Sequence, residues 1–287
     1  MLILELEAYK LPEKSILITG CSSGIGLAAA SSLKQKGYRV FASARQAEDV
    51  EKLSQLGLET IKLDVTDTSS MQQALTHILE KTGGTLYALF NNAGYLQAGA
   101  IEDLSRDQHR AQFETNVFGP MELIRLILPI MRKQGYGRII QNSSILGIIT
   151  LPFYGAYNAS KFALEGYTNT LRQELRGTNI HVSNINPGAI LSDLRDNAFQ
   201  LYQTSGIHKE SSPFKHFYQK MEKHYFVRKD KRSYGQSPEA VVTYLIHALE
   251  SSRPRAHYYV GFSAKIMAFL RRLLPDCALD WIASKVN

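Results

Sequence analysis

A tyrosine and a lysine, Tyr157 and Lys161, stand four residues apart. At that spacing two side chains lie on one face of a helix. A free phenol has a pKa near ~10 and exchanges protons poorly at neutral pH. A nearby ammonium group favours the phenolate and lowers that pKa, which would suit general acid–base chemistry. The same spacing also arises by chance in helices, so the pair alone assigns no function.

Two polar stretches directly follow apolar runs that are predicted to be buried strands. Residues 142–144 (Asn-Ser-Ser) end the run 137–142, and residues 91–94 (Asn-Asn-Ala-Gly) follow the run 86–90. Because the carboxyl ends of parallel strands meet at one edge of a sheet, ligands bind there. We therefore expect Ser144 to lie beside a ligand groove at this edge.

Asn116 is predicted to lie within the long helix between these two stretches. Val117 and Gly119 follow it closely, and all three residue types are unfavourable in a helix interior. We infer that Asn116 is present for the hydrogen bonds of its side chain.

A glycine-rich turn, residues 19–26 (TGCSSGIG), connects a strand expected at 15–19 to a helix expected at 27–36. The amino end of a helix offers unpaired N–H groups and partial positive charge, which suit a pyrophosphate. Glycines let the backbone turn sharply and approach the ligand. The spacing is GxxxGxG rather than GxGxxG, and a plain strand-to-helix turn is the alternative interpretation.

Arg45 follows the second expected strand, at 38–43, where NAD sites place an acidic residue for the ribose 2′-hydroxyl. An arginine can instead bind a 2′-phosphate through charge-assisted hydrogen bonds. The sequence therefore favours NADP over NAD. The alternative is a solvated surface arginine, and Ser23 supplies no second cation.

Strands alternate with helices as far as Pro187, which predicts an α/β protein with a mostly parallel sheet and helices on both faces. Residues 189–236 are expected to be irregular, followed by a last helix and strand. Further strands are expected at 60–64, 180–185 and 258–260, and further helices at 49–55, 70–80 (capped by a serine) and 238–250.

The 287 residues include 33 basic and 26 acidic side chains, a net charge of +7. Residues 1–194 carry 18 of each sign, whereas residues 195–287 carry 15 basic and 8 acidic side chains. The excess charge lacks a nucleic-acid-binding motif, so we expect no nucleic-acid partner. The acidic N-terminus argues against a signal peptide, and no apolar run reaches the roughly 18 residues of a membrane span. Two cysteines form neither a disulfide framework nor a metal set, and we expect a cytoplasmic protein.

Several motifs, taken together and in order, resemble the short-chain dehydrogenase/reductase family. The match covers about residues 14–195, and the C-terminal part (272–275 and Asp280) is similar to bacterial NADP-dependent aldehyde reductases related to retinol and 17β-hydroxysteroid dehydrogenases. The resemblance implies one Rossmann-type domain over 1–287, with a core at 14–195, a substrate lid at 189–236 and C-terminal helices and a strand at 237–287. The motifs are TGxxxGIG at 19–26, Asp64-Val65, NNAG at 91–94, Asn116, Ser144, YxxxK at 157–161 and Pro187-Gly188.

The resemblance also implies a role for each catalytic residue. Tyr157 would be the general acid in carbonyl reduction and the general base in alcohol oxidation. Lys161 would lower the pKa of the tyrosine and bind the nicotinamide ribose. Ser144 would polarise the substrate carbonyl, and Asn116 would hold a water that links Lys161 to solvent.

The cofactor implied by the resemblance is NADP(H). Ser192 stands where the family usually has threonine and keeps the hydroxyl, and Cys21 replaces a more frequent alanine. The expected cofactor contacts are Gly20, Ser22, Ser23, Gly24, Ile25 and Gly26 in the turn, Arg45, Asp64 and Val65 near the adenosine, Asn91, Asn92, Ala93 and Gly94 at the ribose pocket, Tyr157 and Lys161, and Pro187, Gly188, Ile190 and Ser192 at the nicotinamide end.

The segment 189–236 is rich in aromatic and basic residues. The aromatic residues suggest a lipophilic substrate in an apolar pocket, although some of them would pack the segment onto the sheet. The basic residues indicate a solvated face. Its histidines, His208, His216 and His224, lack cysteine or acidic partners at ligand spacing, so we expect no metal site.

Residues 264–274 combine apolar side chains with Lys265, Arg271 and Arg272. This pattern favours a helix packed at the pocket mouth or in a subunit contact. The alternative is a helix on an anionic membrane surface, at the inner face of the membrane.

The predicted function is NADPH-dependent reduction of an aldehyde or ketone on a lipophilic substrate. One alternative is an NAD(P)-dependent alcohol dehydrogenase of the retinol or hydroxysteroid type. Another, of a different class, is a non-catalytic NADP-binding sensor or scaffold, against which the complete set Asn116, Ser144, Tyr157 and Lys161 argues. We expect a homo-oligomer, either a dimer or a tetramer.

Overall fold

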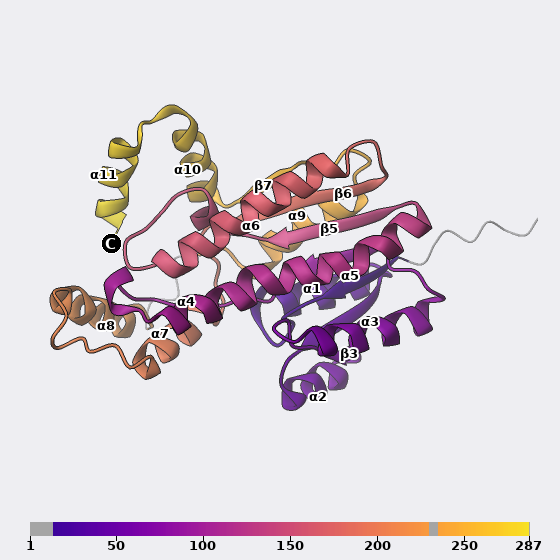
Figure 1. Cartoon of the computed structure of the whole chain (residues 1–287), viewed down its shortest axis with the longest axis horizontal. Coiled ribbons are helices and arrows are strands. Elements are labelled where there is room, and N and C mark those ends of the chain that lie inside the picture. The colour runs from indigo at the N-terminus through magenta and orange to yellow at the C-terminus, as the bar shows by residue number, and fades with distance from the viewer. Residues whose placement is uncertain (1–13, 230–234, 287) are drawn as a thin grey trace, which may run out of the picture.

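The computed structural model describes residues 14–229 and 235–286, and in this part of the chain seven parallel strands form one sheet (Figure 1). The strand order is β3-β2-β1-β4-β5-β6-β7. From β1 the chain adds β2 and β3 on one side, and from β4 it adds β5, β6 and β7 on the other side, so the order of the strands reverses between β1 and β4. In sheets of this kind the ligand site lies beyond the carboxyl ends of the strands at this reversal. The strands are β1 (Ser15–Ile18), β2 (Arg39–Ala44), β3 (Glu59–Lys62), β4 (Ala88–Asn91), β5 (Gly137–Asn142), β6 (Ile180–Pro187) and β7 (His257–Val260).

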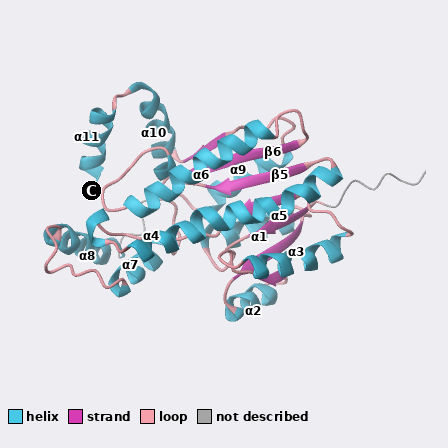
Figure 2. Ribbon diagram, viewed as in Figure 1, coloured by secondary structure: helices cyan, strands magenta, loops and turns pink. Residues whose placement is uncertain are grey.

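Helices cover both faces of the sheet (Figure 2). One face packs against α1 (Gly24–Gln35), α2 (Ala47–Gln55) and α9 (Pro238–Glu250). The other packs against α3 (Thr68–Thr82), α5 (Gly119–Gln134) and α6 (Gly155–Glu174). The doubly wound α/β architecture expected from the alternating pattern is confirmed.

The alternation of side chains along β1 shows how the two layers are built. Ile16 and Ile18 belong to the core under α1 and α9, whereas Leu17 belongs to the core under α3, α5 and α6. Successive side chains of a strand point to opposite faces, so a strand buried on both faces is apolar throughout. Each fully buried aliphatic side chain contributes about 1.5–3 kcal/mol, an upper estimate.

The described part of the segment 189–236 is largely helical, and the prediction that this segment is irregular is wrong. It contains α7 (Leu194–Thr204) and α8 (Lys215–Lys229). Phe214, Phe217, Tyr218 and Met221 recur at the spacing of one helix face and form a small core with side chains of α7. The aromatic residues are therefore organised with a helical period.

Several predicted boundaries shift in the structure. The first helix begins at Gly24, so the glycine turn forms its first turn. The cap of α3 is Asp67, whose Oδ1 accepts the Ser69 N–H at 2.8 Å, and not a serine. Asn116 lies in a π-helical turn, Glu114–Phe118, between α4 (Arg106–Phe113) and α5. The strand over 137–142 and the helix over 238–250 have the predicted bounds.

The chain ends in two helices, α10 (Phe262–Leu273) and α11 (Asp276–Val286), which project from the sheet (Figure 1). None of the described helices is long and apolar enough to cross a membrane. The acidic N-terminus (1–7), Lys231, Arg232 and Tyr234, on which some expectations rest, lie outside the described residues, as do the side chains of 224–229.

Candidate active site

A cavity of about 2180 Å³ opens at the carboxyl ends of the strands. It brings together the glycine turn, the strand ends and the Tyr157 helix, as the strand order requires. The predicted site residues in its wall are Gly20, Ser22, Ser23, Gly24, Ile25, Arg45, Asp64, Val65, Asn92, Ala93, Gly94, Ser144, Tyr157, Lys161, Pro187, Gly188, Ile190 and Ser192.

Three predicted site residues, Gly26, Asn91 and Asn116, lie behind the cavity wall and not in it. A Cβ on Gly26 would stand 2.2 Å from the Gly20 carbonyl oxygen, so this glycine lets α1 pack against the turn. The Asn91 amide is buried and donates to the Pro120 carbonyl at 3.4 Å. Gly26 and Asn91 were expected to contact the cofactor, and in the structure they support the cavity wall from behind.

The glycine turn has the shape that a dinucleotide phosphate requires. Gly20 has φ +68°, and a Cβ there would lie 2.8 Å from the Ala93 Cα, so both conformation and space demand glycine. Gly24 has φ +56°, and a Cβ there would lie 3.1 Å from the Ser192 Cβ. The first turn of α1 holds only uncharged residues. Its free N–H groups and the space that these glycines leave fit a pyrophosphate.

Asn92 connects the ends of three strands. Its Nδ2 donates to the carbonyl oxygens of Thr19 at 2.9 Å and Gly20 at 3.0 Å, and its Oδ1 accepts Nδ2 of Asn142 at 2.8 Å. Thr19 and Gly20 follow β1, Asn92 follows β4, and Asn142 ends β5. The amide therefore fixes the floor of the cavity rather than offering a free group to a ligand.

Ser144, Tyr157 and Lys161 are all buried at one wall of the cavity, at the end of β5 and on α6. The Ser144 Oγ accepts the Leu146 N–H at 3.1 Å and caps the short turn that follows. The Lys161 Nζ donates to the Asn142 carbonyl oxygen at 2.7 Å and lies 5.7 Å from the centre of the Tyr157 ring. Two hydroxyls and an amine thus share one buried corner.

Burial has the largest effect on the pKa values of Tyr157 and Lys161. It raises the pKa of Tyr157 to about 12, while a hydrogen bond from Ser144 acts in the opposite direction. It lowers the pKa of Lys161 to about 8, against the charge of Glu165. Burial and the Ser144 hydrogen bond are the causes of the Tyr157 shift, and the expected effect of Lys161 on this pKa stays a prediction.

Asn116 acts as a structural clamp. Its Nδ2 donates to the Tyr95 carbonyl at 3.0 Å and to the Ser160 Oγ at 3.2 Å, and its Oδ1 accepts the Tyr95 N–H at 3.1 Å. The fully buried amide ties the π-helical turn to α6 and to the loop after β4. The Asn116 side chain therefore bonds to protein atoms, and the water expected to link it to Lys161 stays a prediction.

The end of the cavity beside β2 and β3 contains Arg45 and Asp64. Arg45 is exposed at the tip of β2, and within the described ranges no carboxylate forms a salt bridge with it. Asp64 Oδ1 accepts the N–H and the hydroxyl of Thr66 at 2.9 and 2.7 Å, which fixes the turn after β3. This end of the cavity therefore combines an accessible guanidinium with a rigid turn.

The opposite wall of the cavity comes from α7, α8, α10 and α11. Its apolar surface is formed by side chains such as Phe199, Phe217, Met221, Met267 and Leu279, which lie among charged ones such as Arg195, Arg271 and Asp280. The helix expected over 264–274 corresponds to α10, whose Ile266 and Met267 line the cavity, while the subunit contact and the membrane surface stay predictions.

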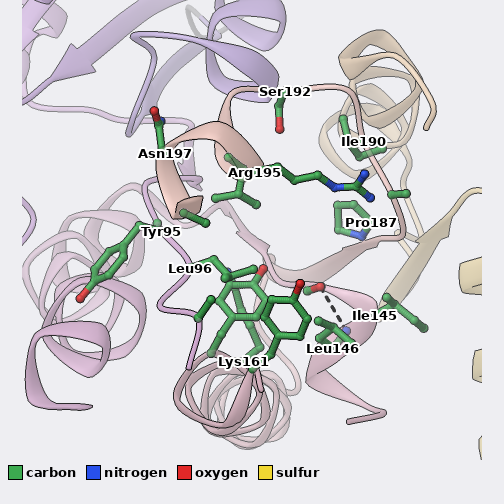
Figure 3. Close-up of a pocket in the computed structure, with 18 of the residues that line it drawn as sticks. Tyr95, Leu96, Ile145, Leu146, Lys161, Pro187, Ile190, Ser192, Arg195 and Asn197 are labelled. Atoms are coloured by element: carbon green, nitrogen blue, oxygen red, sulfur yellow. Dashed lines mark hydrogen bonds between the residues drawn. The ribbon is translucent and has the colours of Figure 1, made fainter. Parts of the chain in front are cut away.

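Several cavity residues were missed from the sequence, among them Tyr95, Leu96, Ile145, Leu146 and Arg195 (Figure 3). Tyr95 and Leu96 directly follow the NNAG motif, and Ile145 and Leu146 directly follow Ser144. Their positions just beyond strand ends would have identified them. No group of three His, Cys, Asp or Glu side chains that could hold a metal occurs among the described residues.

Curated proteins with similar sequences are oxidoreductases by name. The chain is 36% identical over 278 residues to the uncharacterized oxidoreductase YbbO of Escherichia coli, covering 97% of both chains. It is 31% identical to rat 17-beta-hydroxysteroid dehydrogenase type 6, covering 94% of this chain and 88% of the relative. It is 31% identical to mouse retinol dehydrogenase 16, covering 96% and 90%.

Solved structures agree with the fold. A short chain dehydrogenase/reductase from Burkholderia phymatum in complex with NAD superposes with a TM-score of 0.74 and 26% identity over 92% of this chain and 93% of that one. A single-residue variant of actinorhodin polyketide ketoreductase with NADPH gives a TM-score of 0.70 and 27% identity over 86% and 95%. The family model for short chain dehydrogenase matches residues 14–203. On these grounds the chain belongs to the short chain dehydrogenase family.

Proposed function

We propose that this protein is an NADPH-dependent reductase of lipophilic aldehydes or ketones. The observation that carries the proposal is the buried corner of Ser144, Tyr157 and Lys161, which faces both the glycine turn and the apolar wall across one cavity. Such a cavity is large enough for a dinucleotide and a substrate side by side. NADPH, when bound, supplies the hydride for the carbonyl carbon.

The protein side chains would supply the proton and the polarisation. With a pKa raised to about 12 by burial, Tyr157 keeps its proton at neutral pH, as a general acid for reduction must. Ser144 would donate a hydrogen bond to the substrate oxygen and stabilise the charge that develops there. Lys161 would bind the nicotinamide ribose from the Asn142 side of the corner.

The preference for NADP rests on Arg45. Its exposed guanidinium at the tip of β2 can approach a 2′-phosphate, and bidentate contacts suit that group. Structural relatives have been crystallised with either nucleotide, so their names do not decide between the two. The acid expected for a ribose 2′-hydroxyl is replaced here by the arginine.

The substrate class follows from the apolar wall. Aromatic and aliphatic side chains from α7, α8 and α10 would surround a lipophilic carbonyl compound. The names of the retinol and hydroxysteroid relatives support the same class. They also favour one alternative, in which the same site oxidises a lipophilic alcohol and Tyr157 acts as the base.

The proposal is tested by following NADPH consumption across a panel of aldehydes, ketosteroids and retinal, with the corresponding alcohols and NADP⁺ in parallel. Tyr157→Phe is the control, because it removes only the proton donor. We expect reduction of at least one lipophilic carbonyl by the parent, and a loss of about 10³-fold in kcat in Tyr157→Phe with NADPH affinity within about twofold. Turnover of Tyr157→Phe at the parent rate would contradict the mechanism.

A further inference from the structure

A carboxyl-bearing residue, Glu165, lies buried on α6, one helical turn beyond Lys161. Glu165 is only 5% exposed. Its Oε2 accepts Nδ2 of Asn184 at 2.7 Å, and its Oε1 accepts Nδ2 of Asn186 at 2.5 Å. The Nδ1 of His257 lies 3.3 Å from Oε2. The cofactor and substrate contacts proposed above do not use this residue.

Burying this carboxylate is costly, and its surroundings offset that cost. A buried ion loses several kcal/mol of hydration free energy unless hydrogen bonds and opposite charge replace the water. Here two amide groups on β6 aim their N–H groups at the two oxygens, and a histidine on β7 adds a third polar contact. Glu165 thus joins α6 to β6 and β7 directly beneath the cavity.

One of these amides also reaches the main chain of Ser144. The Asn186 Nδ2 donates both to Glu165 and to the Ser144 carbonyl oxygen, at 3.1 Å. The turn after Ser144 rests on the same glutamate, since a Cβ on Gly147 would stand 3.0 Å from the Glu165 Cγ. The carboxylate therefore supports the segment that presents the Ser144 hydroxyl.

The charge of Glu165 also acts on Lys161. It opposes the effect of burial on the pKa of that amine and so favours the ammonium form. The titratable groups around the carboxylate are Lys161 on its own helix and His257 and Tyr259 on β7, with Arg272 of α10 beside Tyr259. His257 is partly exposed, at 23% for its side chain, and its Nε2 contacts Asn169 Oδ1 at 3.1 Å.

We propose that Glu165 is a positioning residue for the reductase reaction: its carboxylate, held by Asn184 and Asn186, fixes the main chain of Ser144 and keeps the Lys161 side chain cationic. This proposal rests on the function proposed above. It assigns Glu165 two separable effects, one through hydrogen bonds and one through charge.

The charge effect is tested with Glu165→Gln, which keeps the size of the side chain and removes the charge. The Lys161 titration is followed by NMR in protein carrying ¹³C-labelled lysine, with Lys161→Arg to assign the signal. We expect the midpoint to fall by about one pH unit, a tenfold change in the ionisation constant. This readout needs neither cofactor nor turnover, so it is independent of whether the proposed function holds.

The hydrogen-bonding effect is tested with Asn186→Ala, which releases Ser144 but leaves the carboxylate in place. We expect kcat for carbonyl reduction to fall about tenfold, with KM for NADPH and the pH midpoint unchanged. In Glu165→Gln both kcat and the pH midpoint should fall. Glu165→Asp, which restores the charge on a shorter side chain, should return the midpoint to that of the parent.

A folded Glu165→Gln protein in which Lys161 titrates as in the parent would overturn the charge effect. Asn186→Ala with parent kcat would overturn the effect on Ser144. If the role of Glu165 were purely structural, Glu165→Gln would lower the melting temperature and leave the titration midpoint of Lys161 unchanged. If Glu165→Gln fails to fold, Glu165→Asp and Asn186→Ala decide: a Lys161 midpoint that lies about one pH unit below that of the parent in Glu165→Asp contradicts the proposal.

Discussion

The two walls of the cavity are built differently. The wall at the strand ends is fixed by hydrogen bonds between elements, such as those of Asn92 and Asn116. The wall from α7, α8, α10 and α11 presents apolar side chains among charged ones. Groups that must transfer protons need fixed geometry, whereas a lipophilic substrate needs apolar area. We infer that the first wall determines the chemistry and the second determines the choice of substrate.

The largest effect is expected on the hydrogen-bonded wall. Lys161→Met removes the amine that donates to the Asn142 carbonyl, while the methylene stem keeps its packing. Because the cation near the reacting groups is lost, kcat/KM for reduction should fall about 10³-fold. Steady-state kinetics with NADPH would measure this, and circular dichroism would establish that the variant is folded. A loss below about fivefold would separate Lys161 from the chemistry.

Arg45→Asp tests the end of the same wall where the cofactor would lie. A hydrogen bond to a charged group contributes about 1.5–3 kcal/mol, so NADPH should bind about 10–100-fold more weakly. NADH binding should stay equal or improve, because an acid can accept the ribose 2′-hydroxyl. Fluorescence titration of both nucleotides measures the two affinities.

The matched control for that titration is Arg176→Asp. This arginine is also exposed, but it lies before the amino end of β6 and does not line the cavity. Equal losses in the two variants would mean that only net charge matters, and that Arg45 does not select the nucleotide.

The pH dependence provides a milder perturbation of the first wall. Burial lowers the pKa of Lys161 to about 8, so its positive charge is present below that pH and is lost as the pH rises. Tyr157, whose pKa is raised to about 12, keeps its proton throughout this range. We expect kcat/KM for reduction to fall about tenfold between pH 7 and pH 9. A flat profile over this range would show that the charge on Lys161 is not needed.

How far the sequence could predict the site also differs between the walls. The strand ends could be located because short apolar runs end in polar motifs, and Ser144 and Tyr157 lie in the cavity as expected. The partners of Asn116 and Glu165 could not be predicted, because these contacts join residues on elements that meet only in the folded chain.

The second wall was harder to predict for a different reason. Its helices follow an apolar spacing that is hidden among lysines and histidines, as in residues 214–221. What stabilises α7 and α8 is their packing against each other and against Ala100, not local helix preference. The number of aromatic residues in this segment predicted an apolar pocket. The helices α7 and α8 could have been predicted only from the spacing of those residues.

Tyr218→Phe tests whether the second wall acts on substrate choice alone. The fully buried Tyr218 hydroxyl donates to Asp103 Oδ2 at 2.6 Å and accepts the Ala100 N–H at 2.9 Å. Its removal leaves a buried N–H unpaired and should cost about 1–3 kcal/mol, which lowers the melting temperature by a few degrees. We expect KM for bulky carbonyls to rise severalfold and kcat for small ones to stay unchanged. Tyr244→Phe, on α9 and outside the cavity, is the matched control.

The smallest effect is expected at the outer surface of α10, where Phe269 and Leu273 are 62% and 63% exposed. Replacing either with serine removes little buried area, so each should change the free energy of unfolding by less than about 0.5 kcal/mol. Ala268→Asp, on the buried side of the same helix, should cost several times more because it buries a carboxylate. Thermal unfolding of the three variants compares the two faces. A large loss in Phe269→Ser or Leu273→Ser would mean that another surface, such as a second subunit, covers this face, and that the second wall of the cavity is completed by that contact.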